Sequence, residues 1–508
     1  MAPAPRDAAL CFIAGAATMT LLQALAAWLR RRREALPFED ELAPLAKDKA
    51  EVLRLRRRHF CSAQSVSYAN SDPLMIVRGD GCYLEDEQGR RFLDTRNNVG
   101  HVGWQHQKVV AAVARQNALL NTNTRYLHPA RVLLARRLLE TFPAPLRDGV
   151  VFLVNSGSEA NDLAMRLARA ATKANGFICV EHGYHGHTEA VLGISPYKFA
   201  GKGGEGPPPT TVAVPCPDIY RGRYVSNTTP SASVREEEQA ALAQCYAQHV
   251  TDACRKLERS GAGVAAFITE SGMSVGGLVM PPTTYLRRCY AAVRAAGGVT
   301  VADEVQVGFG RVGAPHFWAF EEQGVAPDIV TMGKPFGNGH PLGAVVCTRA
   351  VADAFGDVGM EYFNTFGGNA ASCAAGLAVL DVLEAEGLPA RAARVGALLR
   401  DGFRAIAEQP YGALIGDVRG AGLFLGVDLV EDRVKRTPAA AATSALCTRL
   451  LQRHRMLTTI DGPGHNVLVV KPPLCFGEAE ARALLAAVDE VLRALQGADL
   501  SGVGHTPT

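Results

Sequence analysis

The sequence lacks the features that mark several common classes of protein. Its 508 residues contain no internal repeat, no basic arm and no mixed stripe of basic and aromatic residues, so nucleic-acid binding is not predicted. Walker loops and Rossmann fingerprints are absent, which argues against a nucleotide ligand. The twelve cysteines form no CxxC pair and no metal-ligand spacing. Buried, reduced thiols are therefore favoured over disulfides or a zinc site.

A group of three histidines does not predict a metal site either. His182, His185 and His187 lie in one short segment with Gly183 and Gly186. No carboxylate or cysteine joins them at ligand spacing, so a metal is not predicted. A role in a cofactor-binding loop is favoured instead.

The composition predicts a large α/β protein. Hydrophobic residues make up 48% of the chain and there are 51 glycines, enough for a sizeable core with many tight turns. Short β-type runs alternate with helical patterns, which indicates a mainly parallel sheet with crossover helices. The net charge of +3 points to no particular partner.

Two of the β-type runs end next to a reactive side chain. Residues 299–302 precede Asp303, and residues 329–332 precede Lys334. A lysine and a carboxylate at the ends of two buried strands suit pyridoxal 5′-phosphate (PLP), because the lysine forms a Schiff base and the carboxylate pairs with the pyridine nitrogen. Taken singly, each residue could equally be a helix cap or a solvated loop residue.

A third β-type run, residues 151–154, ends at Ser156-Gly157-Ser158, and a helical pattern follows. Such a junction offers free backbone N–H groups and the positive end of a helix dipole, which suits the cofactor phosphate. The alternative is simple capping of the helix by Ser156 or Ser158.

Together these motifs resemble the class III family of PLP-dependent aminotransferases, over roughly residues 70 to 495. The family pattern is a strand-borne Asp-Glu-Val-Gln, here residues 303–306, then Lys334 and a Thr-Phe-Gly-Gly-Asn segment, here residues 365–369. The resemblance implies PLP fold type I, an α/β fold with a large domain and a smaller one. It also implies a homodimer with a shared active site.

The resemblance assigns roles to individual residues. Lys334 is the Schiff-base lysine, Asp303 the partner of the ring nitrogen, and Gln306 a neighbour of the ring hydroxyl. The remaining implied cofactor residues are Ser156, Gly157 and Ser158 at the phosphate, Tyr184 stacked on the ring, Glu270 beside the cofactor, and Thr365 supplied by the neighbouring subunit.

Several segments resemble the phospho-lyase branch of the family rather than ordinary transaminases, namely residues 97–103, 120–128, 194–199, 220–222 and 334–341. One departure is Ala370, where relatives usually carry proline. The branch implies elimination of phosphate from O-phosphoethanolamine, giving acetaldehyde and ammonia. Two alternatives stay open: 5-phosphohydroxy-L-lysine as the substrate, and an ω-aminotransferase that uses a keto-acid acceptor.

A phosphorylated amine needs cationic donors, and arginine suits phosphate because its planar fork binds two oxygens at once. The basic residues of these segments are therefore candidates. Arg419 also resembles the arginine that binds the α-carboxylate in class III transaminases, so its role is open. The full set of substrate-phosphate candidates is Arg96, Arg125, Lys198, Arg221 and Arg419.

The chain is predicted to contain four regions. Residues 1–60 form an amino-terminal extension. Residues 61–115 and 376–495 form the small domain, and residues 116–375 form the large PLP-binding domain. Residues 496–508, rich in glycine and threonine, are predicted to be a disordered tail.

The extension contains an uncharged stretch, residues 10–29, followed by four arginines at 30–33. Its length suits a transmembrane helix, and the arginines would keep the catalytic domain on the cytoplasmic side. The alternative is a mitochondrial targeting segment, because residues 8–33 contain arginine and no acidic residue.

Overall fold

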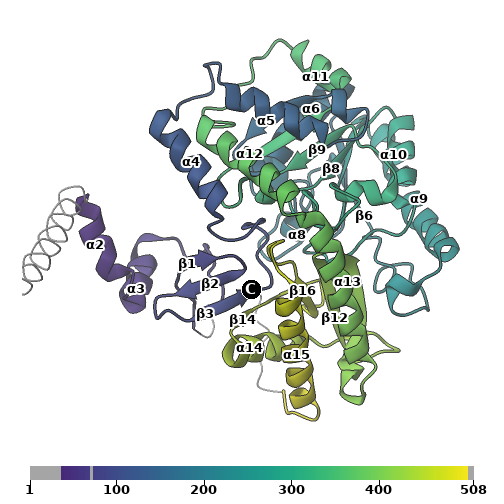
Figure 1. The fold of residues 1–508 in the computed structure, drawn as a ribbon. Helices are drawn as coiled ribbons and strands as arrows, with labels where there is room; N and C mark the ends of the chain where they lie inside the picture. Colours follow the sequence, from purple (N-terminus) through teal and green to yellow (C-terminus); the bar gives the residue numbers. More distant parts are fainter. Residues whose placement is uncertain (1–35, 69–71, 501–508) are drawn as a thin grey trace, which may run out of the picture. The chain divides into compact units, whose positions relative to one another are not determined.

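The computed structural model describes residues 36–68 and 72–500, and Figure 1 labels many of its helices and strands. The helices are α2 (Pro37–Leu45), α3 (Lys49–His59), α4 (Gln107–Leu119), α5 (Pro129–Glu140), α6 (Gly157–Thr172), α7 (Glu189–Leu192), α8 (Pro196–Phe199), α9 (Glu236–Arg259), α10 (Tyr285–Ala295), α11 (Arg349–Gly356), α12 (Ala370–Ala385), α13 (Leu388–Ala407), α14 (Ala440–His454) and α15 (Glu478–Leu495). The strands are β1 (Ile76–Asp80), β2 (Tyr83–Asp86), β3 (Arg91–Asp94), β4 (Val150–Val154), β5 (Gly176–Val180), β6 (Thr211–Val214), β7 (Val264–Glu270), β8 (Val299–Asp303), β9 (Ile329–Met332), β10 (Gly343–Cys347), β11 (Ile415–Ala421), β12 (Phe424–Asp432), β13 (Thr437–Pro438), β14 (Met456–Leu457), β15 (Thr459–Asp461) and β16 (Val467–Val470).

The chain divides into two compact units. One runs up to residue 78 and includes residues 85–90, and the other contains residues 79–84 and everything from residue 91 onward. The second unit carries both large sheets. The boundaries near residues 115 and 375 between the small and large domains stay a prediction.

A seven-stranded sheet forms the centre of the second unit, in the order β4-β10-β9-β8-β7-β5-β6. The strands from β9 to β6 run parallel, while β10 is antiparallel to both β9 and β4. The predicted α/β class with a mainly parallel sheet is therefore confirmed. The β-type runs predicted before Asp303, Lys334 and Ser156 are the strands β8, β9 and β4.

Helices cover both faces of this sheet. Val301 of β8 packs in one buried cluster with Leu163 of α6. The next residue, Ala302, packs in another cluster with Leu286 of α10. Successive side chains of a strand point to opposite faces, so a strand covered on both faces reads as a continuous apolar run. This burial explains why residues 299–302 contain no polar side chain except the buried Thr300.

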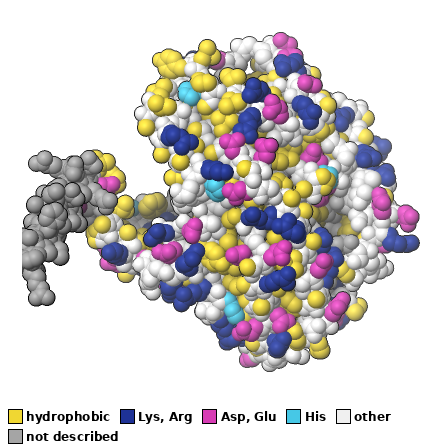
Figure 2. All heavy atoms as spheres, in the orientation of Figure 1, with side chains coloured by type: hydrophobic (Ala, Val, Ile, Leu, Met, Phe, Trp, Pro, Cys, Tyr) yellow, Lys and Arg dark blue, Asp and Glu magenta, His cyan; other side chains and the backbone are white. Residues whose placement is uncertain are grey.

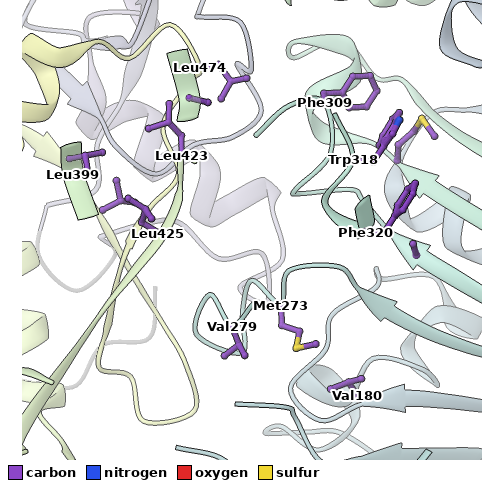
Figure 3. Close-up of a cluster of buried hydrophobic side chains, with 14 of the residues drawn as sticks. Val180, Met273, Val279, Phe309, Trp318, Phe320, Leu399, Leu423, Leu425 and Leu474 are labelled. Atoms are coloured by element: carbon purple, nitrogen blue, oxygen red, sulfur yellow. The ribbon is translucent and has the colours of Figure 1, made fainter. Parts of the chain in front are cut away.

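A second sheet, of the order β11-β12-β16-β15 with β13 beside β12, is antiparallel. Helices α13 and α15 pack together next to it. In Figure 3, Leu399 of α13 lies near Leu423 and Leu425 of this region, and all three belong to one buried hydrophobic cluster. The helix α15 ends at Leu495, and residues 501–508 of the predicted tail lie outside the described residues.

Aromatic side chains fix the two segments that follow Asp303 and Lys334. The ring of Phe309 lies 4.9 Å, centroid to centroid, from the ring of Trp318. Figure 3 shows these two side chains next to each other. The other neighbour of Phe309 is the ring of Phe336, stacked at 5.1 Å. Because Phe309 follows β8 and Phe336 follows β9, this contact packs the segments after the two strands against each other.

The surface carries both signs of charge. On the face in Figure 2, Lys and Arg side chains are interspersed with Asp and Glu side chains. This mixture agrees with the net charge of +3.

The transmembrane helix predicted from the sequence requires a correction. Within residues 36–68 and 72–500, no helix is both long enough and apolar enough to cross a bilayer. The segment on which the prediction rested, residues 10–29, lies outside the described residues. Six of its 20 residues are alanine, which contributes less to hydrophobicity than leucine or phenylalanine does. A transmembrane helix is therefore not assigned to any part of the chain that the structure describes.

Candidate active site

The carboxyl ends of the parallel strands bring the predicted reactive residues to one edge of the central sheet. In the register of β7, β8 and β9, Glu270 pairs with Asp303, and Asp303 pairs with Thr331. Lys334 follows β9 by two residues and begins the short 3₁₀ helix η4 (Lys334–Gly337). The edge where ligands usually bind in open α/β sheets thus holds two carboxylates and one amine.

A pocket of about 290 Å³ lies at this edge. Its walls come from the carboxyl ends of β7 and β8, from the segments that follow β4, β5, β8 and β9, and from Val99. Eight of the predicted cofactor residues line it: Ser156, Gly157, Ser158, Tyr184, Glu270, Asp303, Gln306 and Lys334.

Asp303 is buried and held by three donors. Its Oδ2 accepts hydrogen bonds from Nδ2 of Asn161 at 2.9 Å and from Nδ1 of His185 at 2.8 Å. Its Oδ1 accepts one from the backbone N–H of Val305 at 3.0 Å. These donors fix the position of the carboxylate on the wall of the pocket. Their hydrogen bonds offset the free-energy cost of burying a charged group.

Of these donors, His185 was assigned from the sequence only to a cofactor-binding loop, and Asn161 was assigned no role. Asn161 belongs to the segment 155–162, and its Oδ1 accepts a hydrogen bond from Thr331 Oγ1 at 2.7 Å. Its Nδ2 also reaches the backbone carbonyl of His185 at 2.7 Å. Asn161 therefore ties α6 to β9 and to the loop after β5. The sequence signal that could have identified Asn161 as a site residue is its position one helical turn after Gly157.

His185 is also part of this network. Its Nδ1 faces Asp303, while its buried Nε2 has no hydrogen-bond partner among the residues that the structure describes. A ring nitrogen that donates to a carboxylate fixes the tautomer of the imidazole. The interaction of His185 is thus a hydrogen bond to a carboxylate. Within residues 36–68 and 72–500, no group of three His, Cys, Asp or Glu side chains is placed to bind a metal.

Lys334 provides an amine in an apolar setting. Burial lowers the pKa of Lys334, and the nearby charge of Lys471 lowers it further, while Asp303 and Glu270 act in the opposite direction. A lysine with a lowered pKa has a larger fraction of uncharged amine, which is the form that attacks an aldehyde or takes up a proton.

Glu270 lies at the end of β7 and is buried. Its Oε1 accepts a hydrogen bond from the backbone N–H of Tyr184 at 3.2 Å, and its Oε2 accepts one from the N–H of Ser274 at 2.9 Å. Burial raises the pKa of Glu270 to about 7, with Asp303 adding to the rise and His185 opposing it. Both protonation states of this carboxyl are therefore accessible near neutral pH.

The helix α6 begins at the pocket with its N-terminus exposed to it. Ser156 is the N-cap, because its Oγ accepts from the N–H of Glu159 at 3.1 Å. The capping alternative is thus correct for Ser156, and it does not exclude anion binding. The N–H groups of Gly157 and Ser158 lie in the first turn, where helices leave such donors without intrahelical partners.

The glycine at this turn is required by close packing. A Cβ on Gly157 would lie 2.7 Å from Cγ1 of Val305, and one on Gly333 would lie 3.1 Å from the N atom of Gly157. The segments before Lys334 and after Asp303 therefore press against the start of α6. An amine, a carboxylate and a helix N-terminus around one cavity fit the aldehyde, ring nitrogen and phosphate of PLP.

Tyr184 lines the pocket through the loop after β5. Its ring meets that of Tyr197 edge to face, with centroids 6.0 Å apart. Nζ of Lys198 lies 5.9 Å from the Tyr184 ring centroid and 5.0 Å from that of Tyr197. Lys198 is thus near one wall of the pocket without lining it.

The other basic candidates also do not line this pocket. Arg96 is half-buried, and Arg125 is exposed, with Nη1 3.0 Å from Oε1 of Glu361. Thr365 is exposed as well and does not line the pocket of its own chain. Its contribution to a neighbouring subunit stays a prediction.

Arg221 and Arg419 lie in a cluster of buried charges. Nη2 of Arg221 donates to Asp428 at 2.6 Å. Nη1 of Arg419 donates to Asp428 at 3.1 Å and to Asp417 at 3.2 Å, and its Nε donates to the carbonyl of Gly277 at 2.9 Å. Burial opposes the charge of Arg419, but the aspartates outweigh it and raise its pKa above the usual value.

Comparison with known proteins places this site in a family. The model of the class III aminotransferase family matches residues 64–492. A Drosophila melanogaster protein named alanine–glyoxylate aminotransferase 2-like is 48% identical over 464 residues, covering 91% of each chain. A Caenorhabditis elegans protein named ethanolamine-phosphate phospho-lyase homolog 1 is 40% identical, covering 88% of this chain and 94% of its own.

Two further relatives extend the comparison. An Arabidopsis thaliana protein named alanine–glyoxylate aminotransferase 2 homolog 2, mitochondrial, is 38% identical over 89% of this chain and 90% of its own. Among solved structures, a phospholyase from Arthrobacter in complex with phosphoethanolamine superimposes with a TM-score of 0.80, at 37% identity, over 87% of this chain and all of that one. The chain therefore belongs to the class III aminotransferase family, has PLP fold type I, and takes PLP as its cofactor.

Proposed function

We propose that this protein is a phospho-lyase that consumes O-phosphoethanolamine and water and releases acetaldehyde, ammonia and phosphate. The likeness to the phosphoethanolamine-bound Arthrobacter phospholyase and to the C. elegans phospho-lyase homolog supports this choice. The segments that resemble the phospho-lyase branch support it from the sequence.

The residues of the pocket suit this reaction. PLP, when bound, supplies an aldehyde for the substrate amine and a ring that accepts electrons from a neighbouring carbon. Lys334, with its lowered pKa, takes the proton from the carbon that bears nitrogen. Asp303, whose carboxylate accepts hydrogen bonds from His185 and Asn161, would pair with the ring nitrogen. The bond between the adjacent carbon and the phosphate oxygen then breaks, and its electron pair leaves with phosphate. Water hydrolyses the released two-carbon enamine to acetaldehyde and ammonia.

The observation that favours a lyase over an aminotransferase is the charge cluster around Arg419. An aminotransferase acting on amino acids needs a cation free to bind the α-carboxylate. Here the guanidinium of Arg419 is engaged by Asp417, Asp428 and a backbone carbonyl. Moving it to a substrate would leave two buried carboxylates short of a partner, which is costly. Phosphoethanolamine has no carboxylate and makes no such demand.

An aminotransferase remains the second candidate because of the name of the Drosophila relative. That activity needs a keto-acid acceptor, whereas elimination does not. 5-Phosphohydroxy-L-lysine is the other phosphorylated substrate to compare, since its reacting end also carries a phosphate ester on the carbon next to the one that bears the amine.

The test is to incubate the purified PLP-loaded protein with O-phosphoethanolamine and no keto acid. We expect phosphate and acetaldehyde to appear in equal amounts, the acetaldehyde being followed with alcohol dehydrogenase and NADH. Parallel reactions contain 5-phosphohydroxy-L-lysine, or alanine with glyoxylate. Turnover of alanine and glyoxylate without phosphate release from either phosphorylated amine would reject the phospho-lyase in favour of the aminotransferase.

We also propose a mitochondrial location, supported by the name of the Arabidopsis relative and by the arginine-rich, acid-free composition of residues 8–33. Fractionation of cells with an antibody to the catalytic region tests it. We expect the protein in the mitochondrial fraction, protected from added protease until the membranes are opened. Recovery in the cytosolic fraction alone would reject this location.

A further inference from the structure

The amide of Gln306 has one side occupied by donors. Gln306 lines the active-site pocket and is half-buried. Its Oε1 lies 2.8 Å from Nδ2 of Asn98 and 3.3 Å from Nζ of Lys471. Neither Asn98 nor Lys471 is among the residues that line the pocket.

Lys471 decides the orientation of this amide. An ammonium group donates hydrogen bonds and accepts none, so the atom of Gln306 that faces it must be the oxygen. The nitrogen Nε2 is then left on the other side of the amide. No hydrogen bond to it is found within residues 36–68 and 72–500, and it stands as a donor for a molecule in the pocket.

Lys471 is itself rigidly placed. It follows β16, and its backbone N–H donates to the carbonyl of Thr95 at 2.8 Å. Its Nζ donates to Oγ of Ser274 at 2.8 Å and lies 3.6 Å from Oδ2 of Asp461. With Gln306 as the third neighbour, Nζ of Lys471 is held between a hydroxyl, a carboxylate and an amide oxygen.

We propose that Lys471 and Asn98 are positioning residues that hold the Gln306 amide so that Nε2 donates to an acceptor oxygen of the molecule bound in the pocket. That oxygen belongs either to the ring of PLP or to the phosphate of a substrate. Only the second source rests on the proposed phospho-lyase function. The first needs nothing beyond the cofactor.

A double-mutant cycle on ligand binding tests this. The variants are Lys471→Met, Gln306→Ala and the combination of the two. The first ligand is PLP, titrated into the apoprotein, and the second is inorganic phosphate, titrated into the PLP-loaded protein. We expect each single variant to weaken the binding of one of these ligands by about tenfold, the value of one hydrogen bond of this kind.

The double variant carries the decisive result. If Lys471 acts through Gln306, removing both side chains costs no more than the larger single effect. A weaker Kd for PLP assigns the oxygen to the cofactor, and a weaker Kd for phosphate alone assigns it to the substrate. Losses that add, or unchanged Kd values for both ligands, would overturn the proposal. None of these measurements requires turnover, so absence of phospho-lyase activity leaves the cycle decisive.

A second variant covers the case in which Lys471→Met does not fold. Gln306→Glu keeps an acceptor for Asn98 and Lys471 but replaces the pocket-facing donor by an oxygen. We expect a loss of affinity at least as large as that of Gln306→Ala, in a protein with the parent's circular dichroism. Parental affinity for both ligands would reject the proposal. The control is Lys435→Met, which removes an exposed lysine distant in the sequence from these residues and should leave both Kd values unchanged.

Discussion

Nδ1 of His185 lies 2.8 Å from Oδ2 of Asp303, and both side chains are buried. The histidine comes from the loop after β5, and the aspartate ends β8, 118 residues later. A buried carboxylate needs donors that remain in place when a ligand binds or leaves. His185 thus orients the carboxylate on which the charge of the cofactor ring is predicted to depend.

Replacing His185 with Ala is expected to weaken PLP binding. The substitution removes a hydrogen bond to a charged group, which corresponds to roughly a tenfold to hundredfold loss of affinity. Titration of PLP into the apoprotein measures it. His454→Ala is the control, because His454 also faces a carboxylate, that of Glu490 at 3.6 Å, but does not line the pocket. Equal PLP affinity in the His185 and His454 variants would contradict this role.

Replacing Lys334 with Ala is expected to abolish turnover. General-base catalysis by a positioned side chain contributes about 10²- to 10⁴-fold, and Lys334 has the additional role of holding the cofactor. The visible absorbance of the bound cofactor should change in the same variant. Lys256→Ala, at an exposed site on α9, serves as the control.

The attachment can also be located directly. Borohydride reduction of the PLP-loaded protein followed by peptide mapping should place the label on Lys334. A label on another side chain, or full activity of the Lys334 variant, would reject the assignment.

Much of the sheet edge was predictable because its signals are local. The runs before Asp303 and Lys334 are apolar except for the buried Thr300 and Thr331, because β8 and β9 are covered on both faces. Ser156 caps α6, as the residue type and its position suggest. The carboxyl ends of parallel strands meet at one edge, so residues that end neighbouring strands become neighbours in space.

The partners of these residues were not predictable, because they come from distant parts of the chain. Asn161 and Asp303 are 142 residues apart, and no periodicity relates them. The ion pair between Arg221 and Asp428 spans 207 residues. Because the sequence does not reveal its pairing with Asp428, Arg221 was predicted as a candidate to bind phosphate. The same reason applies to Arg419, because sequence alone does not reveal which cations are already neutralised.

Replacing Glu270 with Gln is expected to change how stability depends on pH. Burial raises the pKa of Glu270 from 4.5 to about 7 in the folded chain. Between these two values the folded state binds more protons than the unfolded state, so the free energy of unfolding falls as the pH rises. Glutamine does not titrate and removes this loss. Relative to the parent, the variant should gain roughly 2 to 3 kcal/mol between pH 5 and pH 8.

Urea denaturation of the apoprotein at the two pH values measures the effect, since without the cofactor its charges do not contribute. Glu258→Gln is the matched control, because Glu258 is exposed on α9 and the substitution is the same. For this control we expect the difference in the free energy of unfolding between variant and parent to be the same at both pH values. If the stability of the Glu270 variant relative to the parent were also the same at both pH values, the Glu270 carboxyl would be ionised over the whole pH range.

Replacing Arg419 with Ala is expected to destabilise the fold, whereas replacing Arg125 is not. Arg419→Ala leaves Asp417 and Asp428 buried without one of their cations, a loss of about 3 to 5 kcal/mol in the free energy of unfolding. Arg125→Ala removes an exposed pair with Glu361, worth about 1 kcal/mol or less. Denaturation of both variants in urea gives the two values. An Arg419 variant with parental stability that lost activity only toward amines carrying a carboxylate would instead show that this arginine binds substrate.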